Sequence, residues 1–402
     1  MSKKLNKKCP KLRFPEFDGD WDELTISDIG EVIRGASPRP KGDRRYYGGK
    51  IPRLMVEDVT RDGKYVTPRT DFLTEEGAKL SRPCEKGTLT IVCSGTVGIP
   101  SFLAVDACIH DGFLAIRKLN KEVVNEDFLY HQLNTLRNTL ESSATHGGVF
   151  TNLTTEVLKN FKIKVTSIAE QEKIASFLGA IATRLTQLRR KRELLQTYKR
   201  GVMQKLFSQQ IRFTQSDGSP FPNWEEKKLG KVIELISGRH LAPDEYQTGK
   251  GKIPYFTGPS DFTNNFLELT KWAIIPAQTG KSGDILITVK GNGVGEMLFL
   301  QLNEVAIGRQ LMSIRPTRVN GAMLYQKLFN YRKTLQALAA GNIIPGLSRG
   351  DLLNLNFFLP SISEQEKIAN FLTTIDRKIE ALSRQIEQTE KFKKGLLQKL
   401  FV

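Results

Sequence analysis

The fragments of this 402-residue chain that suggest catalytic chemistry are each incomplete. Gly280-Lys281-Ser282 matches the end of a phosphate-binding P-loop, but Ile275 stands where that motif requires glycine. Pro243-Asp244 resembles the start of a metal-dependent nuclease motif, yet no Glu-x-Lys follows at a suitable distance. The four histidines have no metal-ligand spacing: His110, His131, His146 and His240. We therefore predict that the chain has no catalytic residue and binds no metal.

The charge of the chain indicates a binding function. The formal net charge is +17 and the pI is about 9.6, which is typical of a protein with a polyanionic partner, most often nucleic acid. A basic soluble protein without such a partner is the alternative. No apolar stretch is long enough to span a membrane. The four cysteines lack CxxC spacing, which favours a reduced, cytoplasmic protein.

Three regions of the first half have side chains suited to phosphates and base edges. One is a basic stretch with tyrosines, the second a glycine-rich turn, and the third a segment whose glycines would let the backbone approach DNA closely. A solvated loop or a plain turn is the alternative in each case. The candidate contact residues are Arg34, Arg39, Lys41, Arg44, Arg45, Tyr46, Tyr47 and Lys50; Ser94 and Thr96; and His146, Thr151 and Asn152.

The second half has three parallel regions. Arginine and lysine favour guanine edges and asparagine favours adenine, but the residue types alone do not specify a target sequence. The candidate residues are Arg239, His240, Tyr246, Lys250 and Lys252; Lys290 and Asn292; and Asn342, Ser348 and Arg349.

These regions belong to a chain that is built twice. The letters EQEKIA occur at residues 170–175 and again at 364–369, and the register then holds without a gap to the end of the chain. Upstream of each copy lie similar landmarks, such as Trp21 and Trp224. Short β-type runs alternate there with Gly, Pro and Asn. The sequence therefore predicts two similar mixed α/β (α+β) domains, at residues 1–166 and 211–360, alternating with helical segments at 167–210 and 361–402.

Each helical segment has apolar residues at heptad spacing, which predicts a coiled coil. Each helix would be roughly 55 Å long at about 1.5 Å per residue. The simplest partner for one helix is the other copy, although Arg192 and Lys199 interrupt the first stripe. Ser167-x-x-Glu170 and Ser361-x-x-Glu364 fit capping boxes at the helix starts. The predicted interface residues are Ile174, Leu178, Ile181, Leu185, Leu188 and Leu195, and Ile368, Leu372, Ile375, Ile379, Leu382 and Ile386.

With these features the chain resembles the specificity subunit of a Type I restriction-modification system over essentially its whole length. The resemblance is carried by both copies of EQEKIA with their heptads, by the terminal QKLF of each copy, and by the openings Arg13-Phe14 with Trp21 and Arg212-Phe213 with Trp224.

The resemblance implies that each α/β domain is a target-recognition domain that reads one part of a split double-stranded DNA sequence. The helices would pair as an antiparallel coiled coil that sets the number of unread base pairs, giving a pseudo-twofold repeat. They would also dock two modification subunits, which carry S-adenosylmethionine and methylate adenine. Restriction subunits that use ATP and Mg would join this core. The chain itself would hold no cofactor.

Two other classes of function remain as alternatives. A stand-alone DNA-processing enzyme would need a carboxylate cluster that the sequence does not contain. A coiled-coil scaffold without a DNA role would not bind DNA even at low salt.

Overall fold

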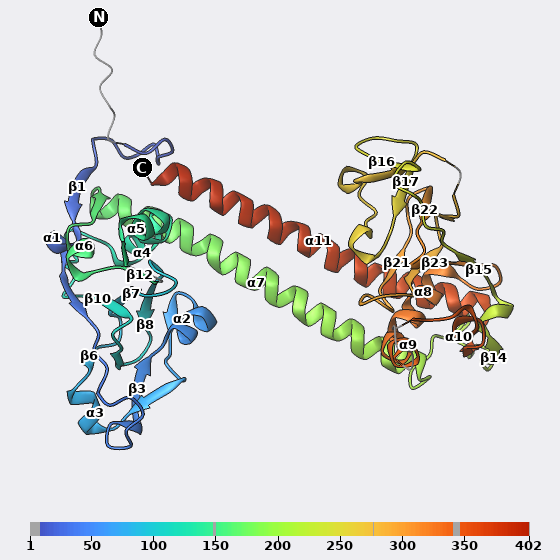
Figure 1. The fold of residues 1–402 in the computed structure, drawn as a ribbon, viewed down its shortest axis with the longest axis horizontal. Helices are drawn as coiled ribbons and strands as arrows, with labels where there is room; N and C mark the ends of the chain where they lie inside the picture. The colour runs from blue at the N-terminus through green and yellow to red at the C-terminus, as the bar shows by residue number, and fades with distance from the viewer. Residues whose placement is uncertain (1–8, 148–149, 276, 341–345, 402) are drawn as a thin grey trace, which may run out of the picture. The chain divides into compact units, whose positions relative to one another are not determined.

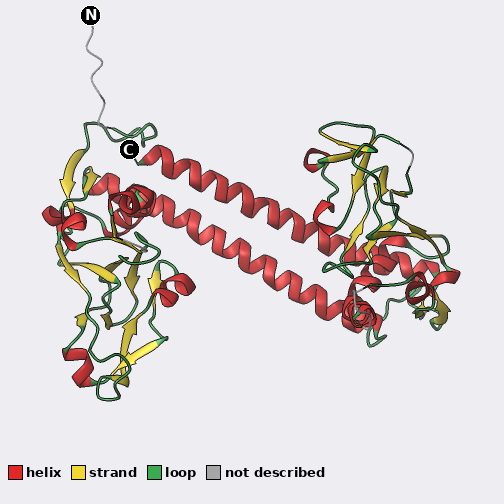
Figure 2. Cartoon of the chain, viewed as in Figure 1, coloured by secondary structure: helices red, strands yellow, loops and turns green. Residues whose placement is uncertain are grey.

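The computed structural model describes residues 9–147, 150–275, 277–340 and 346–401. The chain forms two compact units. The first unit holds Met1–Leu188 and Gln385–Val402, and the second holds Arg189–Arg384. Each unit combines β-strands with short helices and parts of two long ones, as Figure 2 shows. The predicted mixed α/β class is confirmed for both.

The first unit contains two larger sheets (Figure 1). The main sheet has the order β2-β10-β7-β8-β4, formed by β2 (Glu31–Arg34), β10 (Phe113–Arg117), β7 (Leu89–Val92), β8 (Pro100–Leu103) and β4 (Tyr65–Val66). The other has the order β5-β3-β9-β6, formed by β5 (Asp71–Leu73), β3 (Tyr47–Leu54), β9 (Ala107–Ile109) and β6 (Arg82–Cys84). Two strand pairs complete the unit: β1 (Asp22–Thr25) with β13 (Lys162–Val165), and β11 (Thr145–Gly147) with β12 (Phe150–Asn152). The short helices are α1 (Ile26–Ile29), α2 (Val56–Asp62), α3 (Glu75–Lys79), α4 (Glu126–Thr135), α5 (Arg137–Ser143) and α6 (Thr155–Lys159).

Successive residues of the main sheet face two different cores, because side chains alternate across a strand. In β7, Leu89 and Ile91 share a core with Leu129 of α4. Val92 of the same strand shares a second core with Leu54 of β3. Helices therefore cover one face of the main sheet and the second sheet covers the other.

The second unit repeats this plan. Its main sheet has the order β15-β23-β20-β21, formed by β15 (Ile233–Ser237), β23 (Leu311–Pro316), β20 (Ile285–Thr288) and β21 (Met297–Phe299). The other sheet has the order β16-β18-β17-β22-β19, formed by β16 (Tyr246–Thr248), β18 (Lys271–Ala273), β17 (Ile253–Phe256), β22 (Glu304–Ile307) and β19 (Thr279–Lys281). The pair β14 (Glu225–Lys228) with β24 (Asn356–Leu359) corresponds to β1 with β13. The short helices are η1 (Leu229–Lys231), η2 (Pro259–Asp261), η3 (Phe266–Glu268), α8 (Gly321–Asn330), α9 (Arg332–Ala339) and α10 (Arg349–Leu353).

The two long helices are α7 (Ile168–Phe207, 40 residues) and α11 (Ile362–Leu400, 39 residues). In the first unit, Ile174 near the start of α7 shares a core with Leu396 near the end of α11. In the second unit, Met203 near the end of α7 shares a core with Ile368 near the start of α11. In both units, then, the start of one helix lies against the end of the other, which is the antiparallel arrangement that the family resemblance implies.

The predicted stripe residues lie on the covered side of these helices. Nine are buried, and Ile181, Leu195 and Ile379 are partly buried against the same cores. Lys199 does not simply interrupt the stripe. Its Nζ donates a hydrogen bond to Asp376 Oδ1 on α11 over 2.6 Å, and Gln326 of α8 binds the other oxygen of that carboxylate over 2.7 Å. The charge in the stripe is therefore satisfied by a partner on the facing helix.

Each long helix is fastened to its unit by an arginine–glutamate pair, which we term the joint. In the first unit, Arg13 donates two hydrogen bonds of 2.7 Å to the carboxylate of Glu170. In the second, Arg212 binds Glu364 in the same way over 3.1 and 2.7 Å. Both carboxylates are fully buried. The bidentate geometry is the strong form of this interaction, and it ties the opening segment of each half to the first turn of its helix.

The neighbouring glutamine completes the joint. Gln171 Oε1 accepts a hydrogen bond from the amide of Asn125, and Asn125 caps α4. Gln365 Oε1 accepts from the amide of Asn320, which caps α8. The first two letters of each EQEKIA copy thus bind two different segments of the globular fold.

The capping-box prediction was only partly right. The serine half is present, since Ser167 and Ser361 accept weak hydrogen bonds of 3.4 and 3.5 Å from the amides three residues on. The carboxylates of Glu170 and Glu364 bind Arg13 and Arg212 instead of closing the box. A guanidinium presents a carboxylate with a positive charge and two N–H donors in a fixed geometry, whereas a backbone amide presents a single neutral donor.

Replacing Arg212 by methionine should lower the free energy of unfolding of the second unit by about 3 kcal/mol, because the buried carboxylate of Glu364 then loses its counter-charge. Urea unfolding of the wild-type and variant chains measures this difference. Arg190→Met is the matched control. It breaks the exposed Arg190–Glu193 pair, whose side chains are 62% and 65% exposed, and should cost less than about 0.5 kcal/mol. Equal losses in the two variants would show that the joint contributes no special stability.

The second unit also contains a buried lysine. Lys327 of α8 donates to the carbonyl oxygen of Phe358 over 3.0 Å, and its ammonium lies over the rings of Phe207, Trp224 and Phe357 at 5.1 to 5.3 Å. Burial lowers the pKa of Lys327 to about 8. In the first unit the equivalent donor is a neutral amide, since Gln132 Nε2 binds the carbonyl of Lys164 over 2.7 Å.

We predict that Lys327→Gln changes the pH dependence of stability. A lysine pKa lowered on folding opposes folding fully below pH 8, and this cost disappears as pH rises towards the ordinary value of 10.5. The wild-type chain should therefore gain on the order of 3 kcal/mol relative to the variant between pH 7 and pH 10. Urea unfolding at a series of pH values tests this. A difference between the two chains that is constant with pH would contradict it.

Candidate nucleic-acid interface

Part of each candidate region of the first half lies at one end of the main sheet, whereas residues 45–50 of the basic stretch lie beside β5 and α3. Strands β2 and β7 both pair antiparallel with β10, so their carboxyl ends lie at the same edge. Arg34 ends β2, Ser94 follows β7, and Asn152 ends β12. Arg34 donates to Asn152 Oδ1 over 3.3 Å, and Ser94 forms a β-bridge with Asn152. Residues far apart in the sequence thus form one surface, which we term the first edge cluster: Arg34, Ser94 and Asn152.

Asp111 organises this surface, although the sequence analysis did not single it out. Its carboxylate accepts from Ser37 over 2.8 Å and pairs with Arg39 over 3.4 Å, while its carbonyl oxygen accepts from Arg34 over 3.2 Å. Burial raises the pKa of Asp111, but the hydrogen bond from Ser37 and the interaction with His110 outweigh burial and lower it overall. Asp111 therefore stays ionised and orients the two arginines. No motif marks such a residue; only the strand topology places it there.

Some side chains of the basic stretch are exposed to solvent, and others contact neighbouring side chains. Lys41, Arg44 and Lys50 are exposed. Arg45 pairs with Asp43 over 2.7 Å and lies over the ring of Tyr46.

Tyr47 is engaged from both ends. Its hydroxyl donates to the carbonyl of Pro38 over 2.7 Å, and Arg53 lies over its ring. Tyr47 thus supports the loop that carries Arg39. In the turn after β7, Thr96 is exposed. His146 of β11 pairs in register with Thr151 of β12.

In the second unit, the candidate regions around Lys290 and Arg349 come together beside the end of β15. Ser237 ends β15, and its hydroxyl accepts a hydrogen bond of 2.9 Å from Arg349. Lys290, which follows β20, forms a β-bridge with Gly346. We term Ser237, Lys290 and Arg349 the second edge cluster. It matches the first in position but not in residue types.

The remaining candidates of the second unit have different surroundings. His240, Lys250, Lys252 and Asn292 are exposed. Arg239 pairs with Glu245 over 3.3 Å, and the ring of Tyr246 packs on Tyr255 at 5.4 Å. Ser348 caps α10, its hydroxyl accepting from the amide of Asp351 over 3.1 Å, so it has a structural role. Asn342 lies outside the described residues.

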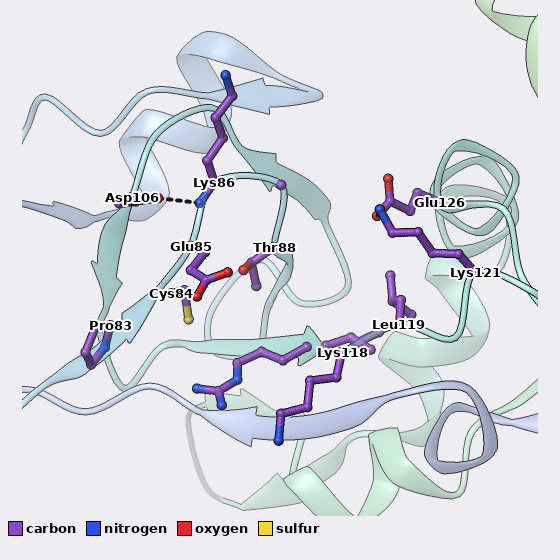
Figure 3. Close-up of a pocket in the computed structure, with 13 residues that line it drawn as sticks. Pro83, Cys84, Glu85, Lys86, Thr88, Asp106, Lys118, Leu119, Lys121 and Glu126 are labelled. Carbon is purple, nitrogen blue, oxygen red and sulfur yellow. Dashed lines mark hydrogen bonds and ion pairs between the residues drawn. The ribbon is translucent and has the colours of Figure 1, made fainter.

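A pocket of about 580 Å³ lies at the opposite end of the same strands (Figure 3). It is lined by residues that precede β7, such as Thr88, and by residues at the end of β10, such as Arg117. Lys121 pairs there with Glu126 over 3.1 Å. Burial raises the pKa of the lining thiol of Cys84 to about 11, so this thiol is not a nucleophile at neutral pH. Because it lies at the opposite end of the strands, the pocket is separate from the first edge cluster.

Two general features agree with a binding protein. Within the described ranges, no group of three or more His, Cys, Asp and Glu side chains is arranged to hold a metal ion. In the same residues, no helix is both long enough and apolar enough to cross a lipid bilayer.

The chain thus repeats one plan, an α/β unit with an edge cluster and the packed ends of two antiparallel helices. The chain matches the family described as "Type I restriction modification DNA specificity domain" over residues 18–196 and 222–391, and it belongs to this family.

Individual relatives agree with this assignment. The chain is 25% identical to the MjaVIII specificity subunit of the Type I restriction enzyme from Methanocaldococcus jannaschii, over 96% of this chain and 92% of that one. It is 26% identical to the putative MjaX specificity subunit of the same organism, over 96% and 94%. In fold it is similar to the crystal structure of the Type I S subunit from M. genitalium, with a TM-score of 0.67 and 18% identity over 98% and 99% of the two chains. A second solved chain, from a study of complex assembly of the Type I system, has a TM-score of 0.60 and 22% identity over 94% and 96%.

If the exposed basic side chains contact phosphates, replacing Lys41 and Arg44 together by alanine should weaken DNA binding across sequences. It should also reduce the slope of log K against log salt by about 2. Fluorescence anisotropy at several salt concentrations, with the chain in complex with the other subunits of its Type I system, measures the slope. Lys86→Ala is the control, because Lys86 is exposed but lines the pocket at the opposite end of the sheet. An unchanged slope in the double variant would remove these residues from the interface.

Proposed function

We propose that this specificity subunit reads a two-part double-stranded DNA target, one part with each unit, and that residues 1–166 and 211–360 are the two reading domains. The observation that carries the proposal is the pair of edge clusters. Both form at the carboxyl ends of equivalent strands, β2 and β7 in one unit and β15 and β20 in the other. A common scaffold with different side chains at one position suits two readers with different sequence preferences.

The charge distribution supports the same proposal. The net charge of +17 supplies sequence-independent attraction to phosphates. The edge clusters add side chains that can discriminate bases, such as Arg34 and Asn152 in the first and Lys290 and Arg349 in the second. Attraction and discrimination would therefore reside in different residues.

We further propose that the repeated helices dock two modification subunits and that restriction subunits join the complex. The helical repeat is the most alike part of the two halves, and similar surfaces suit two copies of one partner. Catalysis would then reside in the partners, with S-adenosylmethionine in the modification subunits and ATP and Mg in the restriction subunits. Methylation of an adenine requires that the base leave the stack, which a partner beside each reader would carry out.

Single-molecule methylation mapping tests the proposal. Cells that express this chain with its neighbouring modification subunit should contain a split motif with a methyladenine in each part, and cells lacking the chain should not. Exchanging residues 1–166 for those of another family member should change one half of the motif and leave the other half unchanged. A change in both halves, or methylation that does not depend on the chain, would refute the assignment of one reader to each unit.

A further inference from the structure

The second unit presents an unusual apolar pair to solvent. Leu267 is 91% exposed and Phe266 is 63% exposed, and Leu267 is the most exposed large apolar side chain among the described residues. Both lie in η3, within the connection from β17 to β18. A single exposed leucine on a surface needs no explanation. Two neighbouring exposed apolar side chains need an explanation if the structure of the loop holds them in water.

The connection does hold them there. Asn265 accepts a hydrogen bond of 3.1 Å from the amide of Leu267 and donates one of 3.0 Å to Glu268. Thr263 binds the other oxygen of Glu268 over 2.7 Å. The carboxylate of Glu268 is thereby engaged within the loop by its own neighbours. These bonds fix the turn in which Leu267 points outward.

The loop is also anchored to the main sheet, at the amino end of β20, where Ile285 pairs with Phe299. Asn264 donates to the carbonyl oxygen of Phe299 over 3.0 Å and accepts from the amide of Gln301 over 2.8 Å. The ring of Phe266 packs edge-on against Trp272 at 5.4 Å. The apolar tip is therefore a preorganised feature, which reduces the entropy cost of using it for binding.

The tip lies next to a basic turn that was already a candidate for DNA contact. A side chain at Gly251 would meet Trp272 at 2.5 Å, so the turn between β16 and β17 lies against the same ring that supports Phe266. Thr248, before this turn, pairs with Lys271 at the end of the apolar loop. Lys250 and Lys252 in the turn are exposed. Two exposed lysines therefore lie in the turn next to the loop that carries the two apolar side chains.

We infer that Phe266 and Leu267 form an apolar wedge that enters a base step of the DNA bound by the second unit, while Lys250 and Lys252 hold adjacent phosphates. This inference rests on the proposed function. Apolar side chains inserted between base pairs unstack and kink the duplex, and the burial of the wedge offsets the cost of unstacking. The tip offers two apolar side chains beside two exposed lysines, and the adjoining carboxylate of Glu268 is held by Thr263 and Asn265.

A protein partner fits the tip less well. A stable protein interface buries on the order of 1,000 Å² or more, with an apolar centre surrounded by a polar rim. Two side chains on a narrow loop are too small for such a centre. The neighbouring lysines are also of the residue type that is depleted at such centres.

The test uses Leu267→Ala in the full chain assembled with its modification subunits, with a duplex that contains the target found by methylation mapping. 2-Aminopurine is placed at successive positions of the half-site of the second unit, away from the methylated adenine. The wild-type complex should raise the fluorescence at one step, which reports unstacking there. Leu267→Ala should abolish that increase and weaken binding about tenfold. The control is Ile274→Ala, because Ile274 is 57% exposed just beyond the other end of β18 and should leave both readings unchanged.

The outcomes separate the wedge from the proposed function. If the wild-type complex binds its two-part target without any increase in fluorescence, or if Leu267→Ala keeps the increase, the wedge is refuted and the reading function stands. If Leu267→Ala instead impairs assembly with the modification subunits, the tip is a protein contact and the wedge is again refuted. If the wild-type complex recognises no two-part target, the proposed function fails, and the wedge with it.

Discussion

The buried arginine–glutamate joint is the interaction on which the arrangement of each unit depends. A carboxylate removed from water requires a counter-charge and several hydrogen bonds, and each of the two joints provides a bidentate guanidinium. The arginine comes from the opening segment of a half and the glutamate from the first turn of a helix that begins about 150 residues later. Since the pair is satisfied only when both segments are in place, it fixes the exit of the helix relative to the sheets.

The joint is repeated more faithfully than its surroundings. In the second unit, Trp224 Nε1 also donates to Glu364 over 3.1 Å. The equivalent Trp21 is buried against Phe128 at 5.6 Å, and its indole nitrogen has no hydrogen-bond partner within the described structure. The hydrogen bonding of the tryptophan thus differs between the two units, whereas the ion pair is the same in both. This is the expected order, because an unpaired buried charge costs more than an unpaired indole N–H.

Much of the scaffold could be predicted from the sequence, because it depends on patterns among residues that are close together in the chain. Heptad spacing and the EQEKIA repeat specify two long helices whatever surrounds them, and the shared landmarks predict two similar α/β domains. The role of Glu170 was predicted wrongly in part, because the capping-box pattern is satisfied by neighbours in sequence while Arg13 is distant. Asp111 was missed for the same reason. Its importance follows from the positions of β2 and β10 in one sheet, which no short pattern records.

At the candidate interface, residue type predicted the regions, but it did not predict which side chains in them are available for contact. Residue type placed Arg34, Asn152 and Lys290 in candidate regions, and the strand order then brought those regions together. Residue type could not distinguish the exposed Arg44 from Arg45, which is held by Asp43, or identify Ser348 as a helix cap. Composition also gave no sign of Leu267, because a leucine in a sequence is expected to be buried. Its exposure becomes informative only when the hydrogen bonds of Asn264 and Asn265 are seen to fix the loop. An apolar tip that polar bonds hold in water is a feature that folding alone does not require.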